Sequence, residues 1–300
     1  MASAARVDAP AKVNLRLRIL SRESSGFHSL ETVFCAISLA DTVEVRRGAP
    51  GVRLKATGGV EMGPPERNLA VRAAHAFARF TGEQPALDIH LTKRIPAAAG
   101  LGGGSSDAAA VLRALNEMQP DPFPRDALLM MAAELGSDVP FFLCGSPLAL
   151  AWGRGERLLA LPPLPERDVL VAHPGVSMPT ADAFRRIAEL RDGGDYVPQG
   201  AAVTLADLAS WSSVARAADN DFAYVVEEAI PAVAEARQAM LDEHAEMALL
   251  AGSGSSVFGI FDGDHHPSLA EERLRGLGMR TWMARTLDRE PPVWVDPRRG

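Results

Sequence analysis

The feature of the sequence that most constrains the fold is a glycine-rich stretch at residues 96–107, which reads PAAAGLGGGSSD. Four of the five residues from 100 to 104 are glycines, and glycine lets a backbone adopt positive φ and approach another group closely. An alanine-rich segment of helical pattern follows, so the free N–H groups and the dipole of its first turn would face the loop. Phosphate suits that place. The stretch therefore predicts a phosphate-binding loop that leads into a helix.

The two best-known phosphate loops do not fit this spelling. A Walker A loop needs a lysine before its final serine or threonine, and no lysine stands here. A dinucleotide-binding loop follows the first strand of its fold, whereas this one lies deep in the chain. A tight strand–helix connection with capping serines would need only one or two glycines. We therefore expect a different phosphate loop, whose candidate contacts are Pro96, Ala97, Ala98, Ala99, Gly100, Leu101, Gly102, Gly103, Gly104, Ser105, Ser106 and Asp107.

Composition bounds the class of protein. The 300 residues are 47% hydrophobic and 23% charged, which is a globular profile, and this length favours two lobes over one core. A net charge of −7 without a basic run argues against nucleic-acid binding. No apolar stretch is as long as a membrane span and no secretion signal opens the sequence, so we expect a cytoplasmic protein without membrane contact. Its two cysteines lie in apolar surroundings, which disfavours a disulfide framework or a cysteine metal site.

The hydrophobic pattern predicts strands and helices along the whole chain. In the first half, strands are expected at 11–20, 32–37, 42–47, 52–56 and 87–91, and helices at 68–81, from the loop serines to about 120, and at 125–135. In the second half, strands are expected at 147–152, 157–161, 168–173, 247–250, 257–261 and 280–286, and helices at 180–190, 224–241 and 268–277. This mixture favours an α+β fold of two lobes.

The best boundary between the lobes is the proline-rich segment 161–167, LPPLPER. Such segments are typical linkers, although a rigid loop inside one domain fits nearly as well. We place an N-terminal domain at residues 1–162 and a C-terminal domain at residues 163–300. We expect a monomer or a weak homodimer.

Three segments together resemble the three motifs of the GHMP kinases, the superfamily of galactokinase, homoserine kinase and mevalonate kinase. They are PAKVNL at 10–15, the glycine loop, and AGSGSSVF at 251–258. Their order and spacing match over nearly the whole chain. The resemblance implies a fold with an ATP-binding lobe and a substrate lobe that enclose the site, with ATP and Mg²⁺ as cofactors.

Within the superfamily, the sequence is most similar to the kinases of 4-diphosphocytidyl-2-C-methyl-D-erythritol, which serve the non-mevalonate route to isoprenoids. The discriminating segments are GFHSL at 26–30 and GSDVPFF at 136–142. Supporting segments lie at 67–69, 93–96, 176–180 and 220–222. The reaction implied is transfer of the γ-phosphoryl group of ATP to the tertiary 2-hydroxyl of that small molecule.

Two residues are the candidate catalytic pair. Asp138 lies in apolar sequence, where a desolvated carboxylate would suit the acceptance of a hydroxyl proton, but a helix-capping aspartate fits the same context. Only the resemblance favours the general base. Lys12 is by itself an ordinary strand lysine, and the resemblance makes it the cation that balances charge in phosphoryl transfer.

The remaining candidates also depend on the resemblance. It implies that Phe27 and Phe184 stack on the cytosine and that His28 hydrogen-bonds to the base edge, although a turn histidine and core phenylalanines are commoner. Asn14 and Thr180 are weaker substrate contacts. Residues near the adenine would be Asn68 and Lys93. Asp107 stands where some relatives carry asparagine, and the resemblance leaves the side chain that contacts Mg²⁺ open.

Two other functions remain possible from the sequence. One is a kinase of the same fold that acts on homoserine or a mevalonate-like alcohol, and the Gly-Phe-His segment at 26–28 argues against it because those substrates carry no cytosine. The other is a non-catalytic relative that binds a nucleotide as a sensor. Such a protein would be expected to have lost Lys12, Asp138 or the loop serines, and all are present.

Overall fold

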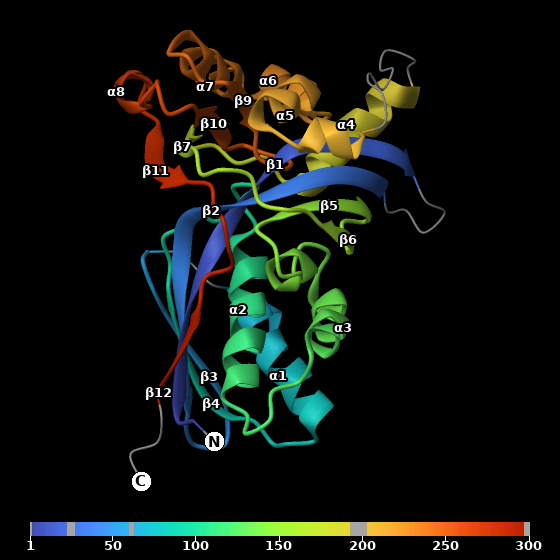
Figure 1. Ribbon diagram of the computed structural model, residues 1–300, viewed down its shortest axis with the longest axis vertical. Coiled ribbons are helices and arrows are strands. Elements are labelled where there is room, and N and C mark those ends of the chain that lie inside the picture. The colour runs from blue at the N-terminus through green and yellow to red at the C-terminus, as the bar shows by residue number, and fades with distance from the viewer. Residues whose placement is uncertain (1, 23–27, 60–62, 193–202, 297–300) are drawn as a thin grey trace.

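The computed structural model describes residues 2–22, 28–59, 63–192 and 203–296, which form an upper and a lower part in Figure 1. Two long antiparallel strands, β1 (Ala4–Arg22) and β2 (His28–Arg47), run from the lower part into the upper part. Both ends of the described chain lie at the bottom of this view, because the last strand pairs with the first. The two parts therefore share one pair of strands.

The larger sheet is built on β1 and β2. Its order is β12-β1-β2-β4-β3, where β12 spans Val293–Asp296, β4 spans Ala86–Thr92 and β3 spans Gly51–Thr57. The N-terminal half of β2, residues 30–35, pairs with β5 (Leu148–Gly153), which pairs with β6 (Arg157–Ala160). A two-residue strand, β8 (Asp219–Asn220), lies parallel to β1.

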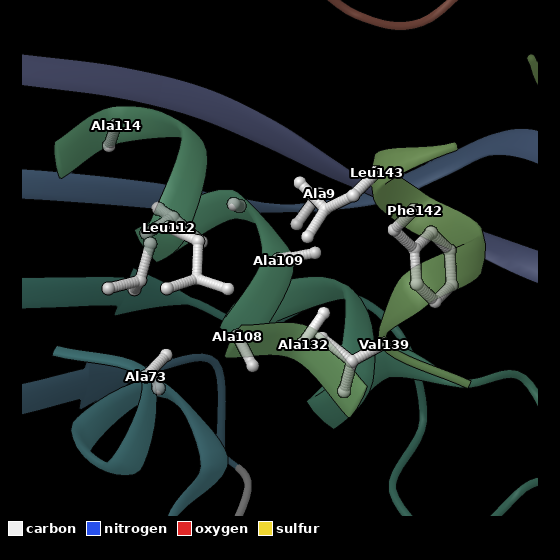
Figure 2. Packing of buried hydrophobic residues seen from close by; sticks show 14 of the residues in the cluster. Ala9, Ala73, Ala108, Ala109, Leu112, Ala114, Ala132, Val139, Phe142 and Leu143 are labelled. Carbon is white, nitrogen blue, oxygen red and sulfur yellow. The ribbon is translucent and has the colours of Figure 1, made fainter. Parts of the chain in front are cut away.

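Three helices lie on one side of this sheet: α1 (Leu69–Thr81), α2 (Gly103–Glu117) and α3 (Arg125–Leu135). Figure 2 shows Ala108, Ala109 and Leu112 of α2 among core side chains from neighbouring elements. Alanines on this helix let its backbone approach its neighbours closely, and burial of the surrounding aliphatic groups stabilises the contact. The glycine loop is thereby attached to the most deeply buried helix of the lower part.

The upper part holds a second, antiparallel sheet in the order β11-β7-β10-β9. Its strands are Arg280–Arg285 (β11), Asp168–His173 (β7), Val257–Phe261 (β10) and Met247–Leu250 (β9). Around it lie helices at Thr180–Asp192 (α4), Trp211–Ala217 (α5), Ala223–Ala229 (α6), Pro231–Asp242 (α7) and Ser268–Gly276 (α8). Short 3₁₀ turns complete the fold at Pro65–Arg67 (η1), Pro140–Leu143 (η2) and Leu205–Leu208 (η3).

The structure confirms the α+β class and corrects several predicted elements. The strands expected at 32–37 and 42–47 are one continuous strand, β2. The helix expected at 224–241 is two helices, because Ile230 is non-helical (φ −134°, ψ 82°) and Pro231 begins α7 without an N–H to donate. Within the described segments, no helix is both long and apolar enough to cross a membrane.

Candidate functional site

Two cavities meet at the glycine loop. The larger has a volume of about 760 Å³ and extends along β1, β2 and α4. The smaller, of about 410 Å³, lies over the loop itself and the start of α1. Gly100 and Gly102 line both cavities, so a molecule in one would touch the same loop as a molecule in the other.

The loop glycines differ in what surrounds them. At Gly100 (φ +78°) a Cβ would lie 1.9 Å from the carbonyl oxygen of Ala251, and at Gly102 (φ +71°) one would lie 3.0 Å from Cγ of Lys12. Packing therefore demands glycine at Gly100, and the left-handed backbone together with a tight contact favours it at Gly102. At Gly104, by contrast, the nearest atom to such a Cβ would be Cδ1 of Leu69 at 3.9 Å. Since packing does not require glycine there, the open space over the helix start is available to a ligand.

Gly102 is also the N-cap residue of α2, and no side chain caps this helix end. The first N–H groups of α2 therefore keep their capacity to bind an anion. Lys12 donates its backbone N–H to the carbonyl of Leu101 at 3.0 Å, which fastens the loop to β1. The loop is thus attached to β1 on one side and continues into α2 on the other.

The smaller cavity brings together most of the predicted nucleotide contacts. Asn68 lies at its wall and caps α1, because its Oδ1 accepts the N–H of Ala70 at 2.9 Å. Ser106 is the exception: it is buried away from the cavity, and its hydroxyl makes no hydrogen bond within the described residues. The predicted residues that do line the cavity are Asn68, Lys93, Pro96, Ala97, Ala98, Ala99, Gly100, Leu101, Gly102, Gly103, Gly104, Ser105 and Asp107.

A buried charge cluster supports this wall. The ammonium of Lys93 donates to Asp107 at 2.5 Å and also to Asp41, whose other oxygen accepts the N–H of Ile95 at 2.9 Å. Burial raises the pKa of the Asp107 carboxyl to about 7, although Lys93 lowers it. Burial alone would lower the pKa of the Lys93 ammonium, but the two carboxylates raise it above its usual value. Asp41 was not predicted, because its contact with Lys93 joins residues 52 positions apart.

The predicted catalytic pair meets in the larger cavity. Lys12 Nζ lies 3.5 Å from a carboxylate oxygen of Asp138, although the residues are far apart in sequence. The ammonium is almost fully buried and also donates to Oδ1 of Asn14 at 2.8 Å. The Asp138 side chain keeps 33% of its surface exposed toward the cavity, so the desolvated carboxylate expected from its apolar neighbours is only partly desolvated. Helix capping is not its role, since α3 ends at Gly136 through a backbone hydrogen bond.

The far end of the larger cavity is aromatic. The rings of His28 and Phe184 stack with centroids 4.6 Å apart and an interplanar angle of 16°, and Phe222 meets Phe184 edge-on at 4.9 Å. Phe27 lies outside the described residues. A flat ring system matches this surface in shape and polarity.

The third predicted motif, at residues 251–258, forms part of the wall of the larger cavity, which also holds the Lys12–Asp138 pair and the aromatic rings. Gly252 and Ser253 line it, and Thr180 exchanges a hydrogen bond with the Ser253 hydroxyl at 2.8 Å. Asn220 holds the loop in place, because its amide donates to the carbonyls of Leu250 and Gly252 at 2.8 Å each.

Sequence reasoning missed several wall residues, and the missed polar ones are Thr32, Ser137, Arg154 and Arg185. Because side chains alternate between the two faces of a strand, the pattern around Thr32 could have indicated that it lies on the same face of the sheet as Asn14. Arg154 and Arg185 lie in no recognisable sequence motif, so nothing in the neighbouring residues indicates that they line the cavity.

Comparison with known proteins agrees with this arrangement. The family profile of the GHMP kinases N-terminal domain matches residues 68–146, and that of the GHMP kinases C-terminal domain matches residues 201–278. The chain therefore belongs to the GHMP kinase family.

Among its relatives are proteins named 4-diphosphocytidyl-2-C-methyl-D-erythritol kinase. The one from Anaeromyxobacter sp. is 40% identical, and the alignment covers 97% of this chain and 94% of the relative. The one from Geobacter sulfurreducens is 36% identical over 92% and 95% of the two chains. The crystal structure of a 4-(cytidine 5'-diphospho)-2C-methyl-D-erythritol kinase superposes with a TM-score of 0.77 at 35% identity and covers 94% of this chain and 98% of its own. Homoserine kinase from Cytophaga hutchinsonii shares the fold at 21% identity, with a TM-score of 0.71 and 98% of both chains covered.

Proposed function

We propose that this protein transfers the γ-phosphoryl group of ATP to the 2-hydroxyl of 4-diphosphocytidyl-2-C-methyl-D-erythritol. The observation that carries the proposal is the position of the Lys12–Asp138 pair, with its 3.5 Å contact, in a cavity that has the glycine loop at one end and the His28–Phe184 stack at the other. A phosphate donor and a base-bearing acceptor would meet at that pair. The relatives of this name support the same substrate.

ATP would occupy the smaller cavity. Its phosphates would lie over Gly102, Gly103 and Gly104, where backbone N–H groups and the start of α2 favour negative charge. The adenine would lie toward Asn68 at the other wall. The γ-phosphoryl group would then reach the larger cavity beside Gly100 and Gly102, which both cavities share.

The chemistry needs a base for the acceptor hydroxyl and a cation for the transferred group. Asp138 would accept the hydroxyl proton at its carboxylate, which faces the cavity. Lys12 would lower the energy of the charge that develops on the phosphoryl oxygens, and its burial makes that interaction stronger than it would be in water. The Asn14 side chain accepts a hydrogen bond from the Lys12 ammonium, so we propose that it supports the ammonium rather than binding the substrate.

Mg²⁺ would accompany the nucleotide. In kinase sites this ion is bound by substrate phosphates, waters and only one or two protein oxygens. Ser105 lines the smaller cavity beside the loop, and its hydroxyl would fit as such a ligand. When bound, the ion would neutralise phosphate charge.

The acceptor would lie along the larger cavity with its cytosine at the aromatic end. His28 and Phe184 are in direct contact, so cytosine would bind against this stack or separate the two rings. The resemblance would make Phe27 a further ring that stacks on the cytosine. Thr180 would contact the middle of the acceptor from the start of α4. In this arrangement, residues 1–162 would supply the ATP lobe and, through β1 and β2, one side of the acceptor cavity. Residues 163–300 would supply the rest of the substrate lobe, with β12 returning to the first sheet.

The test is ATP consumption by the purified protein with three acceptors: the cytidine diphosphate compound, homoserine and mevalonate. We expect turnover with the first alone, and binding of cytidine 5'-diphosphate in the absence of ATP. Turnover with homoserine or mevalonate instead would keep the kinase and reject the cytosine site.

A further inference from the structure

We infer that Thr32, a residue outside the proposed catalytic pair, positions Lys12 by fixing the orientation of the Asn14 side-chain amide. The inference rests on the proposed function for its kinetic test. Thr32 lies on β2, whereas Lys12 lies on β1 and Asp138 in the turn between α3 and η2.

An irregularity in the hairpin creates this contact. Asn14 pairs with Phe34, but the register then shifts so that Arg16 pairs with Val33 and Leu17 with Thr32. Such a bulge locally interrupts the ladder and redirects side chains, and bulges are common beside active sites. Thr32 lies two residues before Phe34, so both face the side of the sheet that Asn14 faces. All three line the larger cavity.

The hydrogen bonds in this group have a determined direction. The Thr32 hydroxyl has one proton, and it donates that proton to the carbonyl of Arg16 at 2.7 Å. Its oxygen can then only accept from Asn14, whose side chain lies 2.7 Å away. Asn14 must therefore turn its NH₂ group to Thr32 and its Oδ1 to Lys12. Lysine only donates, so this is the one amide orientation that bonds the ammonium.

The group is shielded from water, which gives the orientation its effect. Lys12, Asn14 and Thr32 are exposed by 4%, 1% and 1%, respectively. Water therefore cannot replace a lost partner easily, and an unpaired polar group there is costly. If the amide rotated by half a turn, its NH₂ group would face the ammonium and repel it. Lys12 would then move from its place 3.5 Å from Asp138.

The experiment compares Thr32→Val, Thr32→Ser and Thr42→Val in the kinase assay. Valine has the shape of threonine without the hydroxyl, and serine keeps the hydroxyl. Thr42 is a buried threonine of the same strand that lines neither cavity. Its hydroxyl donates to Asp8 at 3.1 Å and accepts from the Arg94 guanidinium at 2.9 Å, so it controls for loss of a buried, hydrogen-bonded hydroxyl. We expect T32V to lower kcat by about 10- to 100-fold with KM values nearly unchanged, since a small misplacement of a reacting group costs that much. T32S and T42V should stay within a few-fold of the wild-type kcat.

A second variant tests the amide orientation itself. Aspartate at position 14 offers an acceptor oxygen whichever way it rotates, so Thr32→Val should cost much less in the Asn14→Asp background than in the wild type. Equal losses of kcat in both backgrounds would overturn the inference. If T32V does not fold, Thr32→Cys against Thr32→Ser gives the same comparison, because a thiol is a weak hydrogen-bonding group of similar size.

A readout independent of turnover separates this inference from the proposed function. The rate at which acetic anhydride acetylates Lys12, followed by mass spectrometry, reports how firmly its ammonium is held. We expect T32V to raise that rate several-fold and T32S and T42V to leave it unchanged. An unchanged rate in T32V would refute the inference even if the wild type proved to be a kinase of another alcohol. A raised rate would support it even then.

Discussion

Replacement of Gly100 by alanine tests whether the glycine loop and the third motif are in the close contact that the structure describes. At this position the backbone is left-handed (φ +78°), which costs a residue with a Cβ about 1–2 kcal/mol. The new Cβ would also lie 1.9 Å from the carbonyl oxygen of Ala251, against 3.4 Å for ordinary contact. One of the two loops would therefore have to move by about 1.5 Å. We expect a total loss of about 2–4 kcal/mol in the free energy of unfolding.

The matched control is Gly104→Ala in the same loop. Its Cβ would have no neighbour closer than 3.9 Å, and its backbone is not left-handed, so alanine there should be neutral or stabilise α2 by up to about 1 kcal/mol. Urea unfolding followed by tryptophan fluorescence measures both variants. The shift of the loop at Gly252, beside Lys12, should also lower kcat/KM of Gly100→Ala by roughly 100-fold. A Gly100→Ala protein as stable as Gly104→Ala would refute the reasoning.

Four further changes have expected outcomes. Asp138→Asn should lower kcat by about 10²–10⁴-fold with little change in the KM for ATP, measured by steady-state kinetics. Asn220→Ala leaves two carbonyls without their donor and should cost about 2–4 kcal/mol in urea unfolding. Phe184→Ala should weaken binding of cytidine 5'-diphosphate and leave ATP binding unchanged in calorimetry; equal losses would contradict the aromatic end as the base site. Asp107 has a folded-state pKa of about 7, above its unfolded value near 3.9, so its contribution to stability is lost as pH rises from about 4 to 7. Asp107→Asn should therefore gain stability relative to the wild type over that range, and a difference independent of pH would contradict the raised pKa.

The sequence predicted best what local pattern determines. The glycine loop, helix α2 and the buried strands β7 and β10 follow from glycine clustering and from hydrophobic spacing over a few residues. The division of the helix expected at 224–241 was missed, although the proline at 231 could have indicated it. Strands β8 and β12 are two and four residues long and exist because β1 pairs with them, which no local pattern records.

The site was predictable as a set of residues but not as a geometry. The resemblance of three motifs named Lys12 and Asp138, yet only the fold places them 3.5 Å apart. Thr32 was missed because its role depends on a register shift in the hairpin. Asp41 was missed because its partner, Lys93, follows β4 and is 52 residues away in the sequence. Contacts between distant segments depend on tertiary packing, which a single sequence does not show.

The most direct test of the account is to identify the product formed from 4-diphosphocytidyl-2-C-methyl-D-erythritol, ATP and Mg²⁺ by mass spectrometry and ³¹P NMR. We expect one added phosphoryl group on the 2-hydroxyl, formed by the wild type and nearly absent with Asp138→Asn. ATP consumption without that product, or the same product rate in the variant, would contradict the proposed reaction or the role of Asp138, respectively.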